Sequence, residues 1–398
     1  MTPEQLDLAV WPIFYAMSRR GIEVGTGALK KLLAGVQGGM SEQMDQIKLR
    51  AEIDPASPKS ISEWMKKEGL TGKHTRTGQM STNERDLVGY NNPVLNAVVL
   101  WRGLAKLEGT FIQPILDRVV ETGSNIVHPK WRLTRVKSGR VSCEDPNLLA
   151  FPSRDEMGKE VRKCFVAREG YSFVSVDFSQ LEPRLVAAIS GDPKLIEIFA
   201  TGRDLYSEIA AALGVPRQAA KIVTLGVLYG MGAKRLMEQL ALAGIVKTEQ
   251  ECEAIIHAWF DAYPAVKALV RDVIRVAKGQ GGWATTQERR RRFLPALFLT
   301  GDRWPNAKLR EEAERQAFNH LIQGTGMEQL KRAMIRVRDV AYRDVHPTLA
   351  IHDEMIYEVP ASQAPEIAER LGSIMSCEYG DVTLKTSFSV GQTWGSLK

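Results

Sequence analysis

Apolar residues recur at steps of three and four along the first part of the chain, which is the spacing of an amphipathic helix. The clearest such stripe covers residues 29–47 and is weakest at a pair of adjacent glycines. After a proline-containing turn at 54–58, a shorter helix is predicted over 61–69. Residues 72–83 are polar and basic, which indicates an exposed loop, and a long helix is predicted over 94–119. This part of the chain is therefore predicted to be mainly helical.

A short apolar run with strand character, Phe173–Val176, marks a change in the middle of the chain. Helices are predicted after it over 181–189, over 205–213, and from Pro216 to about Leu228, since the fixed φ of proline favours a helix start. Residues 249–279 have the pattern of one long helix. These segments are expected to form a second helical region.

Two further strand-like runs lie near the C-terminus, over 348–351 and 355–359. They flank His352, Asp353 and Glu354, as the strands of a β-hairpin flank its turn. The predicted fold class is therefore α+β: helices first, a small antiparallel sheet in the centre and at the end, and helices inserted between its strands.

Composition places the chain among ordinary globular proteins. Its 398 residues suggest about two to three domains. With 44% hydrophobic and 25% charged residues, disorder, a coiled coil and collagen are excluded as the main state. No apolar run approaches the ~18 residues of a membrane-spanning helix, and the N-terminus lacks the basic start of a secretory signal. No membrane partner is therefore expected.

Charge and cysteine usage add two weaker constraints. Lys and Arg total 53 and Asp and Glu total 47, so the net charge of +6 is only a mild bias toward polyanions. The four cysteines are scattered and form no CxxC pair, which argues against a zinc ribbon. Free thiols fit a reducing compartment, so a cytoplasmic location is predicted.

Asp177 and Asp353 are the first candidates for chemistry. Asp177 ends an apolar strand, and Asp353 stands at the tip of the C-terminal hairpin beside Glu354. Two carboxylates from different strands can hold a pair of Mg²⁺ ions together with substrate phosphates, which lowers the barrier to in-line phosphoryl transfer. Taken alone, an aspartate at a strand end is more often a turn or cap residue.

The helix after Pro216 carries a second candidate site. Arg217, Lys221, Leu225 and Tyr229 fall at steps of four and so share one face of the helix. Two cations one turn apart repel each other unless they meet an anion, and a triphosphate is such an anion. The alternative is a solvated basic helix end.

The stretch 127–141 contains five cations and no acid, interleaved with Trp131 and Thr134. A second basic run covers 289–292. Such rows of cations suit a nucleic-acid backbone. Charge runs are also common on solvated faces, so both interpretations stay open on composition alone.

Together these segments resemble the motifs of family A DNA polymerases, the group that includes bacterial DNA polymerase I and many phage replicases. Residues 176–184 resemble the first catalytic motif of the palm, 352–354 resemble its last motif, and 217–230 resemble the nucleotide-binding helix of the fingers. Residues 138–148 resemble the family's primer-template segment, 315–325 resemble a DNA-contacting helix, and 101–107 resemble the helix that leads out of the thumb. The motifs stand in the family's order, from the N-terminal region to the C-terminus.

The resemblance implies a role for each matching residue. Asp177 and Asp353 would hold two Mg²⁺ ions, with Glu354 as a weaker helper, and Lys221 would also give a proton to the leaving pyrophosphate. The residues implied to bind the incoming dNTP are Arg154, Gln180, Glu182, Tyr206, Arg217, Lys221, Leu225 and Tyr229. Those implied to bind primer-template DNA are Arg102, Lys106, Arg140, Asn147, Arg315, Asn319, Gln323 and His352.

Several positions depart from the family's pattern, among them Leu149 and Ala150, which stand where the family often has polar DNA-contacting residues. Leu225 stands where the family usually has Phe or Tyr against the incoming sugar and base, and Tyr206 stands where bacterial members usually have a phosphate-binding His. A tyrosine hydroxyl can still donate a hydrogen bond, but without charge. Pro183 replaces an aliphatic residue, and its missing N–H predicts an end to regular structure there.

By this resemblance the chain is a right-hand polymerase with a helical thumb, a palm built on a small sheet, and helical fingers. The expected division is an N-terminal segment packed on the palm (1–25), thumb (26–115), palm (116–200), fingers (201–305) and the rest of the palm (306–398). Full-length relatives carry a 3′–5′ exonuclease domain before the thumb. Residues 1–100 offer no run of acids for such a site, so no proofreading is expected.

The expected function is template-directed DNA synthesis, in which dNTPs are added to a primer 3′-OH. The alternatives are a single-subunit RNA polymerase, against which Glu182 and residues 138–142 argue, and a catalytically inactive primer-template-binding subunit. An inactive subunit would be expected to lose Asp177, Lys221 or Asp353, and all three are present. A separate exonuclease, helicase or processivity factor is a candidate partner.

Overall fold

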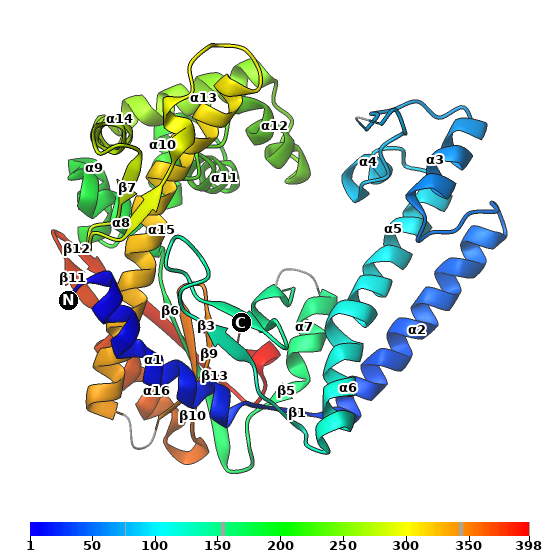
Figure 1. Cartoon of the computed structure of the whole chain (residues 1–398), viewed down its shortest axis with the longest axis horizontal. Helices are drawn as coiled ribbons and strands as arrows, with labels where there is room; N and C mark the ends of the chain where they lie inside the picture. The colour runs from blue at the N-terminus through cyan, green and yellow to red at the C-terminus, as the bar shows by residue number, and fades with distance from the viewer. Residues whose placement is uncertain (76, 153–155, 342–344, 398) are drawn as a thin grey trace. The chain divides into compact units, whose positions relative to one another are not determined.

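The computed structural model describes residues 1–75, 77–152, 156–341 and 345–397. Its contacts divide the chain into two compact units, and Figure 1 labels the helices and strands of both. Unit 1 comprises Met1–Arg20, Lys130–Glu144 and Gly170–Val390. Unit 2 comprises Gly21–Pro129, Asp145–Glu169 and Gly391–Lys398.

The centre of unit 1 is a four-stranded sheet in the order β13-β6-β10-β9. Strand β10 (Glu354–Pro360) lies antiparallel between β6 (Tyr171–Phe178) and β9 (His346–Ile351). Strand β6 is buried from Ser172 to Val176, as expected for a short continuous run in the middle of a sheet. The predicted central strand and the predicted C-terminal hairpin are both confirmed.

Helices and short ribbons surround this sheet. Helix α1 (Pro3–Arg20) packs on β9 and on α15 (Asn306–Ala341), and α16 (Ala364–Met375) packs on β6. The other strands of unit 1 pair as β3 (Lys130–Arg132) with β4 (Ser142–Glu144), β7 (Trp283–Thr285) with β8 (Arg291–Phe293), and β11 (Cys377–Tyr379) with β12 (Val382–Leu384), beside β13 (Thr386–Gly391) at the sheet edge.

The remaining helices of unit 1 share one hydrophobic core with part of α15. Trp259 is fully buried in it, and its indole N–H donates to Thr224 Oγ1 at 3.3 Å. These helices are α8 (Leu181–Ser190), α9 (Pro193–Ala200), α10 (Leu205–Leu213), α11 (Arg217–Leu228), α12 (Ala233–Leu242), α13 (Glu249–Ala262) and α14 (Pro264–Gly279), with 3-10 turns η3 (Pro295–Phe298) and η4 (Ala361–Gln363). The predictions for α8, α10 and α11 are confirmed.

The prediction of one long helix over 249–279 is wrong. The structure has two helices, α13 and α14, which meet at Tyr263 and Pro264. Proline has no N–H for the helix ladder and disfavours helical geometry in the residue before it. Tyr263 accordingly leaves the helical region, with φ −126° and ψ 69°.

The expectation for Pro183 is also wrong, because regular structure continues through it. Pro183 is the third residue of α8 and lies in its first turn. The N–H groups of a first turn have no acceptor within the helix, so a missing one costs no hydrogen bond.

Unit 2 is mainly helical and has a second small sheet, in the order β2-β1-β5. Its helices are α2 (Thr26–Lys48), α3 (Pro58–Lys67), α4 (Glu84–Val88), α5 (Pro93–Lys106), α6 (Gln113–Thr122) and α7 (Glu156–Lys163). Its strands and short turns are β1 (Ile22–Val24), β2 (Ile126–Val127), β5 (Phe165–Val166), η2 (Leu148–Ala150) and η5 (Trp394–Ser396). A π-helical segment, η1 (Leu107–Ile112), joins α5 to α6 within the predicted long helix.

The loop predicted over 72–83 has a buried end. Most of its described residues are exposed, but Met80 packs into the core of this unit and its N–H donates to Ser62 Oγ at 3.1 Å.

None of the helices in the described part of the chain is both long and apolar enough to cross a membrane.

Candidate active site

Three acidic residues gather at one end of the central sheet. Asp177, next to last in β6, is the cross-strand partner of Glu354, the first residue of β10. Asp353 directly precedes Glu354, and its carbonyl accepts from the Phe178 N–H at 3.3 Å. The turn is tight because His352 adopts a left-handed φ of 57°. Antiparallel pairing thus brings together acids that are far apart in the sequence.

Glu354 differs from the two aspartates in its surroundings. It is buried, and its carboxylate accepts a short hydrogen bond from the Ser175 hydroxyl. Asp177 and Asp353 are only partly buried. One face of the antiparallel pair carries the side chains of Ser175, Asp177 and the facing Glu354. This shared face explains the hydrogen bond between Ser175 and Glu354. The geometry makes Asp177 and Asp353 the more accessible carboxylates.

This donor set fits a hard divalent cation. Carboxylate oxygens are the ligands that Mg²⁺ takes from proteins, and it completes its shell with water and substrate phosphates. The described ranges contain no group of three or more His, Cys, Asp or Glu side chains arranged to hold a metal by themselves. A metal ion held by Asp177 and Asp353 would need further ligands, such as water or substrate phosphates.

A second group of residues lies where α10 meets α11. Arg217 donates through Nε and Nη2 to the two carboxylate oxygens of Asp204, both at 2.8 Å. Its guanidinium carbon lies 5.7 Å from the Tyr206 ring centroid, and Lys221 Nζ lies 5.9 Å from the same centroid. The two basic side chains singled out from the sequence therefore both lie close to one tyrosine ring.

Asp204 is a member of this group that the sequence analysis did not single out. Its carboxylate also caps α10 by accepting from the Ser207 N–H at 2.8 Å. The hydrogen bonds from Arg217 and Ser207 hold the pKa of Asp204 far below its usual range. An aspartate immediately before a helix is the sequence signal of such a cap, but its contact with Arg217 comes from the packing of two helices.

Glu182 connects a third group. Its Oε1 accepts from Arg140 Nη2 at 3.0 Å, and the Tyr229 hydroxyl lies near both of these side chains. Burial, reinforced by the negative charge of Glu182, raises the pKa of Tyr229 well above its usual range. Asn319 Nδ2 lies 3.5 Å from the Tyr229 carbonyl oxygen. Arg140, Glu182, Tyr229 and Asn319 therefore form one connected set.

The turn after α11 depends on a glycine. Gly230 has a φ of 67°, and a Cβ built on it would lie 2.5 Å from Arg315 Cγ. The chain thus passes directly over Arg315 of α15. Two other residues are predicted to contact the dNTP. Gln180 is the residue just before α8 and has a left-handed φ of 56°, and Leu225 is half-buried on α11. Gln323 is half-buried on α15.

Four predicted residues are not part of this geometry. Arg102, Lys106 and Asn147 belong to unit 2, and Arg154 lies outside the described residues. Arg102 donates through Nε to the Pro55 carbonyl at 2.6 Å and through Nη1 to the Thr82 carbonyl at 2.8 Å. These contacts tie loops of unit 2 together. Lys106 and Asn147 are exposed.

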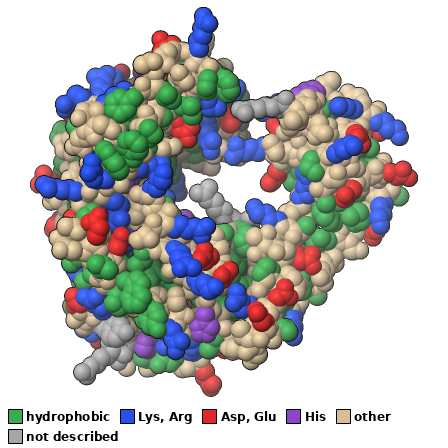
Figure 2. All heavy atoms as spheres, in the orientation of Figure 1, with side chains coloured by type: hydrophobic (Ala, Val, Ile, Leu, Met, Phe, Trp, Pro, Cys, Tyr) green, Lys and Arg blue, Asp and Glu red, His purple; other side chains and the backbone are tan. Residues whose placement is uncertain are grey.

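The charges of the surface are mixed. Figure 2 shows Lys and Arg side chains interspersed with Asp and Glu over the visible face. Within the basic stretch 127–141, Arg132 and Arg135 each donate to Glu144, at 2.6 Å and 2.5 Å. Part of that basic run is therefore neutralised by a facing strand.

Known proteins resemble this chain over nearly its whole length. The model of the family "DNA polymerase family A" matches residues 27–396. DNA polymerase I of Thermus aquaticus, described as thermostable, is 34% identical over 343 residues, which cover 82% of this chain and 39% of that protein. DNA polymerase I of Deinococcus radiodurans is 32% identical over 413 residues, which cover 99% of this chain and 42% of that protein.

A solved structure shows the same fold. The polymerase domain of Pol1 from M. smegmatis, in complex with DNA primer-template and dNTP, has a TM-score of 0.86 and 29% sequence identity, covering 98% of this chain and 70% of that chain. The chain spans about two fifths of the length of the curated relatives above. With a family match over most of its residues, the chain belongs to DNA polymerase family A.

Proposed function

We propose that this chain catalyses template-directed DNA synthesis, adding dNTPs to a primer 3′-OH. The observation that carries the proposal is the pairing of Asp177 with Glu354, which places Asp353 at the same end of the sheet. The helix that carries Arg217 and Lys221 belongs to the same unit. The M. smegmatis relative in its primer-template and dNTP complex supports the assignment of this substrate class.

Asp177 and Asp353 are the residues proposed to hold two Mg²⁺ ions. Ions bound there would neutralise charge on the reacting phosphates and favour the deprotonated 3′-OH. Glu354 is proposed to help by orientation, because its hydrogen bond with Ser175 fixes it beside Asp177. The catalytic work of the protein is then mainly positioning and charge stabilisation.

Arg217 and Lys221 are proposed to bind the triphosphate, and Lys221 to protonate the pyrophosphate as it leaves. Arg217 already binds a carboxylate through two parallel N–H groups, which is also the geometry it would use for a phosphate. Asp204 therefore competes with the nucleotide for Arg217. Tyr206, whose ring lies close to both cations, can add an uncharged hydrogen bond.

Glu182 and Tyr229 are proposed to exclude a ribonucleotide 2′-OH, since the hydrogen bond from Arg140 holds Glu182 near the Tyr229 hydroxyl. Gln180, Leu225 and Arg154 stay predictions as dNTP contacts. The residues proposed to follow the minor groove near the primer end are Arg140, Asn147, Arg315, Asn319, Gln323 and His352. Minor-groove acceptors are shared by all base pairs, so such contacts test pair shape without reading sequence.

Arg102 is better suited to a structural role than to DNA contact, because two backbone carbonyls occupy its guanidinium. Lys106 remains the proposed phosphate contact of this helix. The five-part division into thumb, palm and fingers, the cytoplasmic location, the lack of proofreading and the partner proteins named above all stay predictions.

Primer extension tests the proposal. Wild-type protein is given a labelled primer-template, Mg²⁺ and one dNTP at a time, and it should add only the nucleotide complementary to the next template base. Bound duplex without extension would indicate the inactive subunit. Equal use of ribonucleotides would indicate the RNA polymerase.

A further inference from the structure

Four charged side chains form a buried group away from the carboxylates of the sheet. They are Asp7 of α1, Arg290 of the turn between β7 and β8, and Glu328 and Lys331 of α15. Arg290 donates through Nη1 and Nη2 to the two oxygens of Asp7, both at 3.0 Å. Its Nε lies 3.4 Å from Glu328 Oε1, which also accepts from the Thr286 hydroxyl at 2.8 Å. Segments far apart in the sequence therefore share one ionic network.

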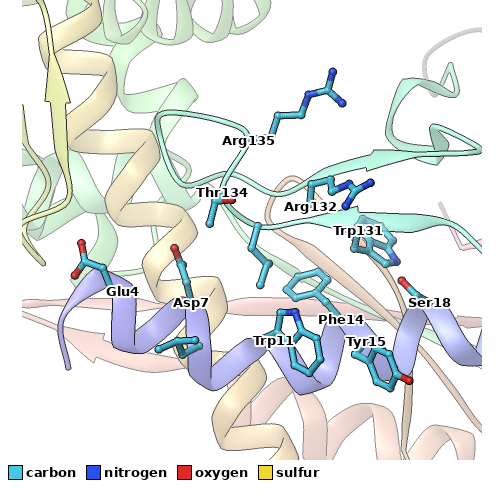
Figure 3. Close-up of a pocket in the computed structure, with 12 residues that line it drawn as sticks. Glu4, Asp7, Trp11, Phe14, Tyr15, Ser18, Trp131, Arg132, Thr134 and Arg135 are labelled. Carbon is cyan, nitrogen blue, oxygen red and sulfur yellow. The ribbon is translucent and has the colours of Figure 1, made fainter.

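Lys331 is the most deeply buried member. Its side chain is 0% exposed, and Nζ donates to Asp7 Oδ1 at 2.6 Å and to the Gly139 carbonyl at 2.8 Å. Burying an ammonium costs several kcal/mol unless good partners compensate it. The two acceptors are a carboxylate on α1 and the backbone of the loop between β3 and β4. Figure 3 shows the Asp7 side chain rising from α1 toward that loop.

The loop fits closely against these cations. Gly139 has a φ of 80°, and a Cβ built on it would lie 2.5 Å from Arg290 Nε. One residue earlier, the Ser138 carbonyl faces Gly324 of α15, where an added Cβ would lie 3.2 Å from its oxygen. Gly139 N–H also closes a turn onto the Val136 carbonyl at 2.9 Å. Backbone of the loop is thus held by α15 and by Arg290.

The next residue in the loop belongs to the proposed active site. Arg140 donates to Glu182, which lies near the Tyr229 hydroxyl. We infer that Lys331, anchored by Asp7, is a positioning residue that holds the Gly139 backbone so that Arg140 can meet both Glu182 and the primer-template. This inference rests on the proposed function, because it assigns Arg140 to DNA. Lys331 itself is buried and touches no DNA.

The charge balance of the group indicates a suitable variant. Asp7 and Glu328 face Arg290 and Lys331, two charges of each sign. Lys331→Met removes one cation but leaves Asp7 paired with Arg290. It also leaves the Gly139 carbonyl without its ammonium donor. Arg336→Met is the matched control, since Arg336 also lies on α15 and donates to two backbone carbonyls, of Ile374 and Met375.

The test is a double-mutant cycle on primer-template affinity. The Kd is measured for wild type, Lys331→Met, Arg140→Ala and the double variant. Lys331→Met should weaken binding about as much as Arg140→Ala, on the order of tenfold, the size typical of hydrogen bonds to charged groups. The double variant should bind primer-template no more weakly than Arg140→Ala, because Lys331 is inferred to act on DNA binding only through Arg140. Arg336→Met should leave the Kd unchanged. The inference would be overturned if the fold-changes in Kd of the two single variants multiply in the double variant. It would also be overturned if Lys331→Met has the wild-type Kd.

Amide hydrogen exchange of the free protein separates this inference from the proposed function. Exchange across residues 138–141 should accelerate in Lys331→Met and not in Arg336→Met, whether or not the protein is a polymerase. Unchanged exchange would contradict the inference that Lys331 holds the Gly139 backbone. Faster exchange in a protein that binds no primer-template would contradict only the proposed function. If Lys331→Met does not fold, Lys331→Met with Glu328→Gln removes one charge of each sign and carries the same measurements.

Discussion

Lys221 and Arg217 stand one turn apart on α11 but have different surroundings. Arg217 binds Asp204, whereas Lys221 is exposed and lies near the Tyr206 ring. Lys221→Ala should raise the KM for dNTP and lower kcat, together about 10- to 100-fold in kcat/KM, because a charge-assisted contact to the triphosphate is lost. Steady-state extension at varied dNTP measures both constants. Lys234→Ala, which removes an exposed lysine of α12, is the control. An unchanged KM would remove Lys221 from the triphosphate site.

Leu225 stands where the resemblance to family A polymerases predicts an aromatic residue. It is half-buried on α11, one turn after Lys221. A leucine presents less surface to an incoming sugar than an aromatic ring, so Leu225→Phe or Leu225→Tyr should change the use of dideoxynucleotides relative to dNTPs. Competitive incorporation measures the ratio. If both substitutions leave the ratio at its wild-type value, Leu225 does not face the sugar.

At the scale of elements, Arg102 links α5 to two loops of unit 2. Its guanidinium is half-buried, and burial lowers the pKa of Arg102 while two carbonyls accept its hydrogen bonds. Arg102→Met should lower the free energy of unfolding by about 1–3 kcal/mol, since two carbonyls lose a charged donor. Urea titration measures this. Lys106→Ala, on the exposed face of the same helix, should leave stability unchanged. A fully stable Arg102→Met that binds DNA more weakly would return Arg102 to the DNA contacts.

Some elements could be predicted closely because their ends are encoded locally. Helix α10 has the predicted bounds, since Asp204 caps its start and Gly214, with a φ of 63°, ends it. The break between α13 and α14 also has a local signal in the sequence. Pro264 interrupts a helix even where the apolar stripe continues across it. Pro183 does not end α8, because a proline in the first turn of a helix costs no hydrogen bond.

The candidate site was predictable only in part. The residue types at Asp177, Arg217, Lys221 and Asp353 could be selected from spacing and resemblance. The contact between Asp7 and Lys331 joins residues 324 positions apart, and the ion pair of Arg140 with Glu182 joins residues 42 apart. Such pairs depend on how sheets and helices pack, which no periodicity reports. Arg102 shows the reverse case, a basic residue in a DNA-contacting motif whose donors are used within the protein.

At the scale of the whole molecule, Glu328 makes stability depend on pH. Burial raises the pKa of Glu328 to about 6, from 4.5 for an exposed Glu. Between these values the folded protein retains a proton that the unfolded chain releases, so this group's contribution to stability falls as pH rises. The difference in unfolding free energy between wild type and Glu328→Gln should therefore fall by about 2 kcal/mol from pH 4 to pH 7. Urea titrations across that range measure it, and a pH-independent difference would contradict the assignment.

Asp177 is proposed to serve the reaction rather than the fold or the binding of DNA. Single-turnover incorporation and primer-template Kd are measured for wild type, Asp177→Asn and Glu358→Gln. Glu358 is the control, a buried carboxylate of β10 that pairs with Arg20 at 2.6 Å. The prediction is that Asp177→Asn loses incorporation to background with its Kd unchanged, while Glu358→Gln retains both. If incorporation survives in Asp177→Asn, or is lost together with DNA binding, Asp177 does not have this role in the reaction.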